Sequence, residues 1–388
     1  MQISKRIIVL ILFTGLAFMG FQCSSTELTS AKLYIQQKNY DKALESLKSE
    51  VSKNPKSDEG YYWLGVVYSE KENYDEMLKA FDASLAISKK FETHIEDSKK
   101  YAWANLFNKG VSSFQRGNNT DNEDSIKIYY ERSIYQFENA VLMQPDSSDT
   151  YKNLAFVYIN AERPDDAIKP LQKIIDLEKE LDGYRLLGKI YYDKGSDKMS
   201  EFKSSKNLAD SSEAINQFNK AIQVLEDGRK TYPNDQQILL YLSNSYIGAN
   251  KIDVAIDAFK TGVEQEPENK YYRYNYGVLL LGADRFDEAV VQFTKAVDID
   301  PEYQNAIYNL GVTYVKWGTH LNKLAEDKGE TSSEYKSKYE MALPHLEKVV
   351  DMKSDDAATW ELLGRVYGVL GMTEKAEDAF DKADKLNK

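Results

Sequence analysis

The sequence has few of the residues that usually carry chemistry. Its 388 residues include one cysteine, Cys23, and three histidines, His94, His320 and His345. A single thiol cannot form an internal disulfide, and no histidine lies at metal-ligand spacing from another histidine or a carboxylate. There is no phosphate-binding loop, no glycine-rich dinucleotide turn and no nucleophile elbow. We therefore expect no catalytic site, no metal site and no cofactor.

Long apolar runs and an excess of positive charge are also missing. Only residues 7–21 form a continuous stretch of apolar or small residues, and this stretch is short for a membrane-spanning helix, which needs about 20 residues. The chain has 62 acidic residues against 50 lysines and arginines, which gives a net charge of -12. Because a strongly acidic protein repels phosphate backbones, we do not expect nucleic acid as a partner.

The N-terminus has the order of a secretory signal. Two basic residues precede the apolar run, and Cys23 follows it directly after Gln22. This order resembles the lipobox of bacterial lipoproteins, in which cleavage before the cysteine leaves a lipid-bearing N-terminus. The resemblance implies a signal peptide over residues 1–22 and a lipid on Cys23. It places the protein in the bacterial cell envelope, facing the periplasm or the exterior, and Ser24 favours the outer membrane. Since Gln22 stands where a small residue is usual, an uncleaved anchor or an ordinary signal peptide stays open.

A second pattern runs through the rest of the chain. Small residues recur at Ala31, Gly65, Gly110, Ala155, Gly188, Ser243, Gly277, Gly311 and Gly364. Each is followed, after a second small or apolar position, by a large apolar residue: Leu47, Phe81, Phe137, Leu171, Leu225, Phe259, Phe293, Leu346 and Phe380. Small residues let two helices approach closely and the large ones fill the remaining space. Each helix pair would leave an apolar face that only the next pair can cover.

This pattern resembles the tetratricopeptide repeat, a helix-turn-helix unit of about 34 residues. Five of the eight prolines stand where its closing proline is expected, at Pro55, Pro145, Pro233, Pro267 and Pro301. The resemblance covers residues 24–388 and implies an all-α fold, a right-handed α-solenoid of about nine repeats, some with elongated helices. Repeats 1 and 2 would occupy residues 24–91, and repeats 3 to 9 would occupy residues 103–388.

The repeats are interrupted at four places. Three polar insertions fall between the two helices of a repeat, near residues 118–130, 196–216 and 319–338. They fit lengthened antiparallel helices or loop growth, or alternatively protrusions that dock a partner. A further insertion, residues 92–102, separates the second repeat from the third, and we expect a hinge or a boundary between two subarrays there.

The resemblance also indicates a groove. In solenoids of this kind the first helices line an inner surface, and the residue before the Leu-Gly pair faces it. Here that position holds Asn108, Asn153, Asn275 and Asn309. A side-chain amide both donates and accepts hydrogen bonds, so such a ladder can grip the backbone of an extended peptide. Alternatively, these asparagines only link neighbouring helices.

Aromatic residues accompany the asparagines in the predicted groove. We take Tyr241, Tyr274 and Tyr308 as candidate contacts, because aromatic side chains give a large contact area for little loss of rotamer freedom. Packing in the core is the alternative for each of them. The prediction is a non-catalytic, membrane-anchored interaction scaffold that binds a peptide or a partner protein in its concave groove. The alternative is a glycan-handling component of envelope polysaccharide export or peptidoglycan turnover, with exposed tyrosines stacked on sugar rings.

Overall fold

The computed structural model describes residues 25–329 and 333–387. Within these ranges the chain forms eighteen α-helices and no β-strand, which confirms the predicted all-α fold. No helix in the described part is both long and apolar enough to cross a membrane. The predicted signal peptide and the lipidation site at Cys23 lie outside the described residues.

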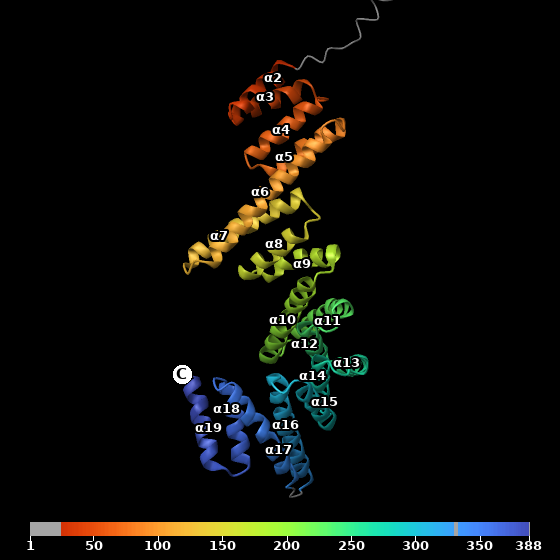
Figure 1. Ribbon diagram of the computed structural model, residues 1–388, viewed down its shortest axis with the longest axis vertical. Helices are drawn as coiled ribbons and strands as arrows, with labels where there is room; N and C mark the ends of the chain where they lie inside the picture. Colours follow the sequence, from red (N-terminus) through yellow and green to blue (C-terminus); the bar gives the residue numbers. More distant parts are fainter. Residues whose placement is uncertain (1–24, 330–332, 388) are drawn as a thin grey trace, which may run out of the picture. The chain divides into compact units, whose positions relative to one another are not determined.

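The helices follow one another as nine consecutive pairs (Figure 1). The pairs are α2 (Thr26–Gln36) and α3 (Tyr40–Lys53), α4 (Asp58–Glu70) and α5 (Tyr74–Ile87), α6 (Glu92–Asn118) and α7 (Glu123–Met143), α8 (Ser148–Asn160) and α9 (Pro164–Glu178), α10 (Leu181–Ser205) and α11 (Leu208–Thr231), α12 (Gln236–Gly248) and α13 (Ile252–Gln265), α14 (Lys270–Gly282) and α15 (Phe286–Ile299), α16 (Gln304–Lys328) and α17 (Glu334–Met352), and α18 (Ala357–Val369) and α19 (Thr373–Leu386).

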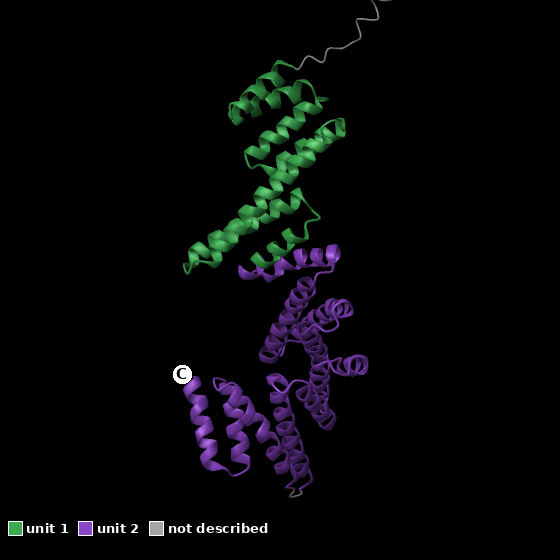
Figure 2. Ribbon diagram, in the orientation of Figure 1, with its two compact units in different colours: residues 1–157 green, residues 158–388 purple. Residues whose placement is uncertain are grey.

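The chain divides into two compact units (Figure 2). Unit 1 ends at Val157 and unit 2 begins at Tyr158, so the division falls within α8. Residues 92–102, where we expected a hinge or a boundary between two subarrays, form the N-terminal part of α6. Each unit is described by itself below.

Side-chain caps set where many of the helices begin. Asn39 and Asn73 precede the second helices of the first two pairs, and each accepts a hydrogen bond from a backbone N–H in the first helical turn. Asn122 and Asp235 do the same for α7 and α12. These caps satisfy N–H groups that have no partner inside the helix. The asparagine and aspartate residues between the helices therefore fix the start of the segments that pack.

The small residues of the repeat do protect close contacts. A Cβ atom added to Gly65 would lie 2.4 Å from Cδ1 and Cε1 of Phe81, and one added to Gly277 would lie 2.7 Å from Cε1 of Phe293. Both phenylalanines are fully buried. The large apolar residues of the first eight repeats are all 0% exposed, whereas Phe380 in the last helix is 40% exposed.

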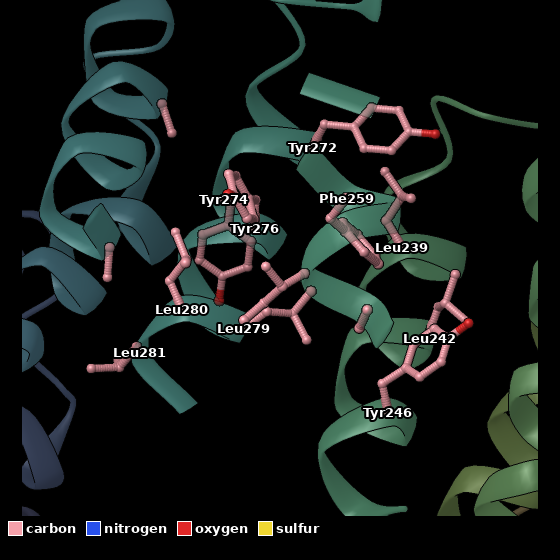
Figure 3. Packing of buried hydrophobic residues seen from close by; sticks show 14 of the residues in the cluster. Leu239, Leu242, Tyr246, Phe259, Tyr272, Tyr274, Tyr276, Leu279, Leu280 and Leu281 are labelled. Carbon is pink, nitrogen blue, oxygen red and sulfur yellow. The ribbon is translucent and has the colours of Figure 1, made fainter. Parts of the chain in front are cut away.

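The largest described core lies in unit 2 and has members on helices α10 to α16. Figure 3 labels members on α12 to α14. Tyr272 of α14 packs against Phe259 of α13 with ring centroids 6.0 Å apart. Leu239 and Leu242 of α12 are both fully buried in the same cluster. Successive helix pairs thus bury one another's apolar faces, as the repeat pattern requires.

The three insertions within repeats are lengthened helices, which is one of the alternatives that the sequence left open. They extend the pairs α6 and α7, α10 and α11, and α16 and α17, with only short connections between the helices of each pair. Within the pair α6 and α7, the ring centroids of Phe114 and Tyr130 lie 5.8 Å apart. Within the pair α10 and α11, those of Tyr192 and Phe218 lie 5.9 Å apart. Apolar and aromatic contacts therefore hold the extended arms together.

Candidate functional site

The two asparagines of unit 1 occupy open positions. Asn108 on α6 is exposed, and Asn153 on α8 is partly buried. The Asn153 side chain donates a hydrogen bond from Nδ2 to the backbone oxygen of Asp149, one helical turn earlier, at 2.8 Å. This contact lies within α8 and makes no link to another helix.

The prediction that Asn275 faces a groove is wrong. The residue is 0% exposed. Its Nδ2 donates to the backbone oxygen of Tyr271 at 2.8 Å, and its Oδ1 accepts from Ser243 Oγ on α12 at 3.0 Å. A fully buried amide with both ends hydrogen-bonded cannot grip a peptide, so Asn275 is not a groove residue. It links two neighbouring helices, which is the alternative that the sequence left open.

Asn309 lies between these extremes. It is partly buried on α16, and its Nδ2 donates to the hydroxyl oxygen of Tyr274 at 3.0 Å and to the backbone oxygen of Asn305 at 3.0 Å. The structure therefore brings together two of the predicted residues, Asn309 and Tyr274. Tyr274 itself is only 8% exposed, and burial raises the pKa of its hydroxyl while the hydrogen bond with Asn309 lowers it.

Tyr274 belongs to a cluster of three tyrosines at the start of α14 and α16. The Tyr303 ring lies 5.3 Å from the Tyr274 ring and 6.0 Å from the Tyr271 ring. Lys270 covers two of these rings, with Nζ 5.2 Å from the Tyr271 centroid and 5.1 Å from the Tyr303 centroid. Its ammonium group also pairs with Asp300 at the end of α15. We call Lys270, Tyr271, Tyr274, Asp300 and Tyr303 the tyrosine site.

The tyrosine site contains both a buried uncharged phenol, Tyr303, and an ion pair between Lys270 and Asp300. Tyr303 is 8% exposed, and its hydroxyl oxygen has no hydrogen-bond partner among the described residues. Burial raises the pKa of Tyr303, with further contributions from neighbouring tyrosines and Asp300. Hydrogen bonding to Lys270 lowers the pKa of Asp300. The site therefore holds neutral phenols beside one ion pair.

An open cavity of about 650 Å³ adjoins the tyrosine site. Tyr271, Lys270 and Asp300 contribute to its wall, together with Glu266 and Glu268 from the turn before α14. Pockets of this kind combine aromatic area with a few polar groups that orient a ligand. The described residues contain no group of three or more histidine, cysteine, aspartate or glutamate side chains placed to hold a metal ion.

The other predicted aromatic residues lie elsewhere. Tyr241 on α12 is partly buried and lies 5.5 Å from the Tyr192 ring, with Lys189 Nζ 6.0 Å from its own centroid. Tyr308 on α16 is partly buried against the core of the last helices, and burial raises its pKa. The sequence named Tyr274 and Asn309 as groove residues without predicting their contact, which the structure shows. It did not name Lys270, Asp300 or Tyr303.

Comparison with known proteins identifies the repeats. A family model of the tetratricopeptide repeat matches residues 28–90 and 240–303, and a second model of the same repeat matches residues 357–388. A search of curated proteins finds no match.

Solved structures resemble the chain only loosely. MamA is 22% identical, with 47% of this chain and 95% of that chain covered and a TM-score of 0.35. YrrB, described as a TPR protein with an unusual peptide-binding site, is 21% identical, with coverages of 57% and 95% and a TM-score of 0.33. Yeast Tom70 is 12% identical, with coverages of 92% and 83% and a TM-score of 0.37.

Proposed function

We propose that this chain, a tetratricopeptide-repeat protein, is a non-catalytic interaction scaffold that binds a peptide segment of a partner protein. The observation that carries the proposal is the tyrosine site on the open cavity of about 650 Å³. Tyr271 presents an aromatic ring on the cavity wall, Tyr303 packs against that ring, and Tyr274 packs against Tyr303. Rigid aromatic side chains of this kind anchor protein interfaces.

The packing favours a preformed site. Tyr274 and Tyr303 are buried, and Lys270 is tied both to the rings and to Asp300. A site whose side chains are already ordered loses less conformational entropy when a ligand binds. The partly buried Tyr271 is therefore the residue on which we expect binding energy to concentrate.

A peptide library tests this proposal. We would select displayed random dodecapeptides on the purified chain and compare Tyr271→Ala with the control Tyr135→Ala, an exposed tyrosine of unit 1. Selected peptides should lose about tenfold or more in affinity with Tyr271→Ala, as hot-spot truncations do, and should keep it with the control. Equal affinity for both variants, at unchanged melting temperatures, would contradict the proposal. A glycan array with the same proteins would test the sugar-binding alternative.

We further propose that the scaffold is held on a bacterial membrane by a lipid on Cys23. The support is the N-terminal sequence, where the cysteine follows the apolar run. Two or more acyl chains give a stable membrane anchor. Metabolic labelling of cells with an alkyne-tagged fatty acid should mark the wild-type chain and not Cys23→Ser; label on both proteins would exclude this site.

A further inference from the structure

The insertion between the second and third repeats builds a small pocket in unit 1. Residues 92–102 form the N-terminal part of α6, and His94, Asp97 and Tyr101 recur on it at spacings of three and four residues. Residues at these spacings share one face of a helix. Together with Tyr62 and Glu70 of α4 and nearby serines, they enclose a cavity of about 300 Å³. We call it the α4–α6 pocket.

The wall of the pocket is acidic. Glu70 and Asp97 line it, both are exposed, and neither forms an ion pair among the described residues. Glu70 takes part in a hydrogen bond with the Tyr40 side chain. No lysine or arginine contributes to the pocket wall. Two carboxylates that face one small cavity without a counter-ion create a negative potential that attracts a cation.

A second acidic cavity, in unit 2, differs from the α4–α6 pocket in having basic side chains in its wall. It lies beside α9, α10 and α11 and has a volume of about 560 Å³. Its three basic side chains already pair with acids in the same wall, as Lys194 does with Asp165 and Lys198 with Glu201. Three of the six acids in that wall pair with its basic side chains, whereas the wall of the α4–α6 pocket offers its two acids no basic partner.

Aromatic rings complete the α4–α6 pocket. The Tyr62 ring is stacked on Phe91 at 4.7 Å with an interplanar angle of 9°, and it lies 6.0 Å from the His94 ring at 70°. Tyr62 is therefore held in place, while Tyr101 is 67% exposed at the pocket wall. Phe91 and Phe81 stack on the Tyr62 ring, so the exposed Tyr101 ring is the one whose face can attract a cation or pack against an aliphatic stem.

We propose that the α4–α6 pocket binds a lysine side chain of a partner segment. The ammonium group lies between Glu70 and Asp97, and the aliphatic stem lies along Tyr101. An ammonium is a compact charge on a flexible stem, so it suits two carboxylates on separate helices. A guanidinium is a planar fork, which fits a single carboxylate through two parallel hydrogen bonds. The inference rests on the proposed interaction function but uses different residues in the other unit.

Fluorescence anisotropy with a labelled heptapeptide, Gly-Lys-Gly-Lys-Gly-Lys-Gly, tests the pocket on the full chain. The pocket variant combines Glu70→Gln with Asp97→Asn. The control combines Asp82→Asn with Glu96→Gln, two exposed acids of the same unit, so both proteins change in net charge by the same amount. The pocket variant should weaken binding about tenfold or more, and the control less than about twofold. Tyr101→Leu should weaken it about two- to fivefold.

The alternatives give different results. If both double variants weaken binding equally, the peptide is held by the general negative charge of the chain and the pocket is excluded. Equal binding of a peptide with norleucine in place of each lysine would exclude recognition of the ammonium, and equal or tighter binding of the arginine peptide would exclude lysine as the preferred ligand. Tyr271→Ala should leave lysine-peptide binding unchanged, which separates failure of this inference from failure of the tyrosine site.

Discussion

The close contact between α4 and α5 predicts that Gly65→Ala destabilises unit 1. The new Cβ would lie 2.4 Å from two ring atoms of Phe81, whose side chain is 0% exposed. The ring would have to move by about 1 Å within a close-packed core. Overpacking costs about 1–3 kcal/mol, and so short a contact belongs at the upper end of that range. Against this loss, alanine stabilises a helix by about 1 kcal/mol relative to glycine. We expect the free energy of unfolding to fall by about 2 kcal/mol.

Urea unfolding followed by circular dichroism measures this loss, and hydrogen exchange of peptides from α4 and α5 places it in unit 1. Gly368→Ala is the control, because a Cβ added there on α18 meets nothing within 4 Å. It should stabilise the protein by about 1 kcal/mol. Phe81→Leu should partly rescue Gly65→Ala, because the first repeat pairs Ala31 with the fully buried Leu47. If Gly65→Ala stabilises the protein as Gly368→Ala does, close approach of the helices is not the reason for glycine at this position.

Two further predictions concern burial and pH. Phe293→Ala should lower the free energy of unfolding by about 3–5 kcal/mol, and Phe380→Ala by roughly half as much, because Phe380 is 40% exposed and solvent can fill the space; equal losses in urea unfolding would contradict this. His345 lies parallel to Tyr314 at 6.0 Å, and burial, with a contribution from Lys348, lowers its pKa. The unfolded chain then binds the proton more readily, so acidification from about pH 7 to pH 5 should reduce stability. His345→Gln should flatten that slope, the exposed control His94→Gln should not, and an unchanged slope in His345→Gln would exclude His345 as its origin.

The repeated helix pairs could be predicted because the sequence pattern reports the contact that forms them. A small residue on one helix and a large apolar residue on the next meet directly, as Gly277 and Phe293 do. Phe380, on the last described helix, is 40% exposed, whereas the corresponding residues of the other eight repeats are fully buried. The order of the helices therefore follows from the spacing, whereas for the insertions the spacing left lengthened helices and loop growth both open.

The roles of the predicted asparagines could not be obtained in the same way. Asn275 and Asn309 occupy the same position of the repeat, yet the first is fully buried and the second is not. Each amide bonds to a different kind of side chain on the preceding first helix, Asn275 to Ser243 and Asn309 to Tyr274. These partners lie 32 and 35 positions away, and a pattern read one repeat at a time does not include them.

The candidate chemistry lies where the repeats depart from their pattern. Lys270 and Asp300 pair across one repeat, at the ends of α14 and α15, and neither position is fixed by the repeat. In unit 1, Asp97 and Tyr101 belong to an insertion that the repeat does not contain. Asp97 and Tyr101 are exposed, whereas repeat positions such as Phe81 are buried. Substitutions at the two kinds of position should therefore affect different properties. Changes at Asp97 and Tyr101 should alter binding with little change in stability, and changes at buried positions should do the reverse.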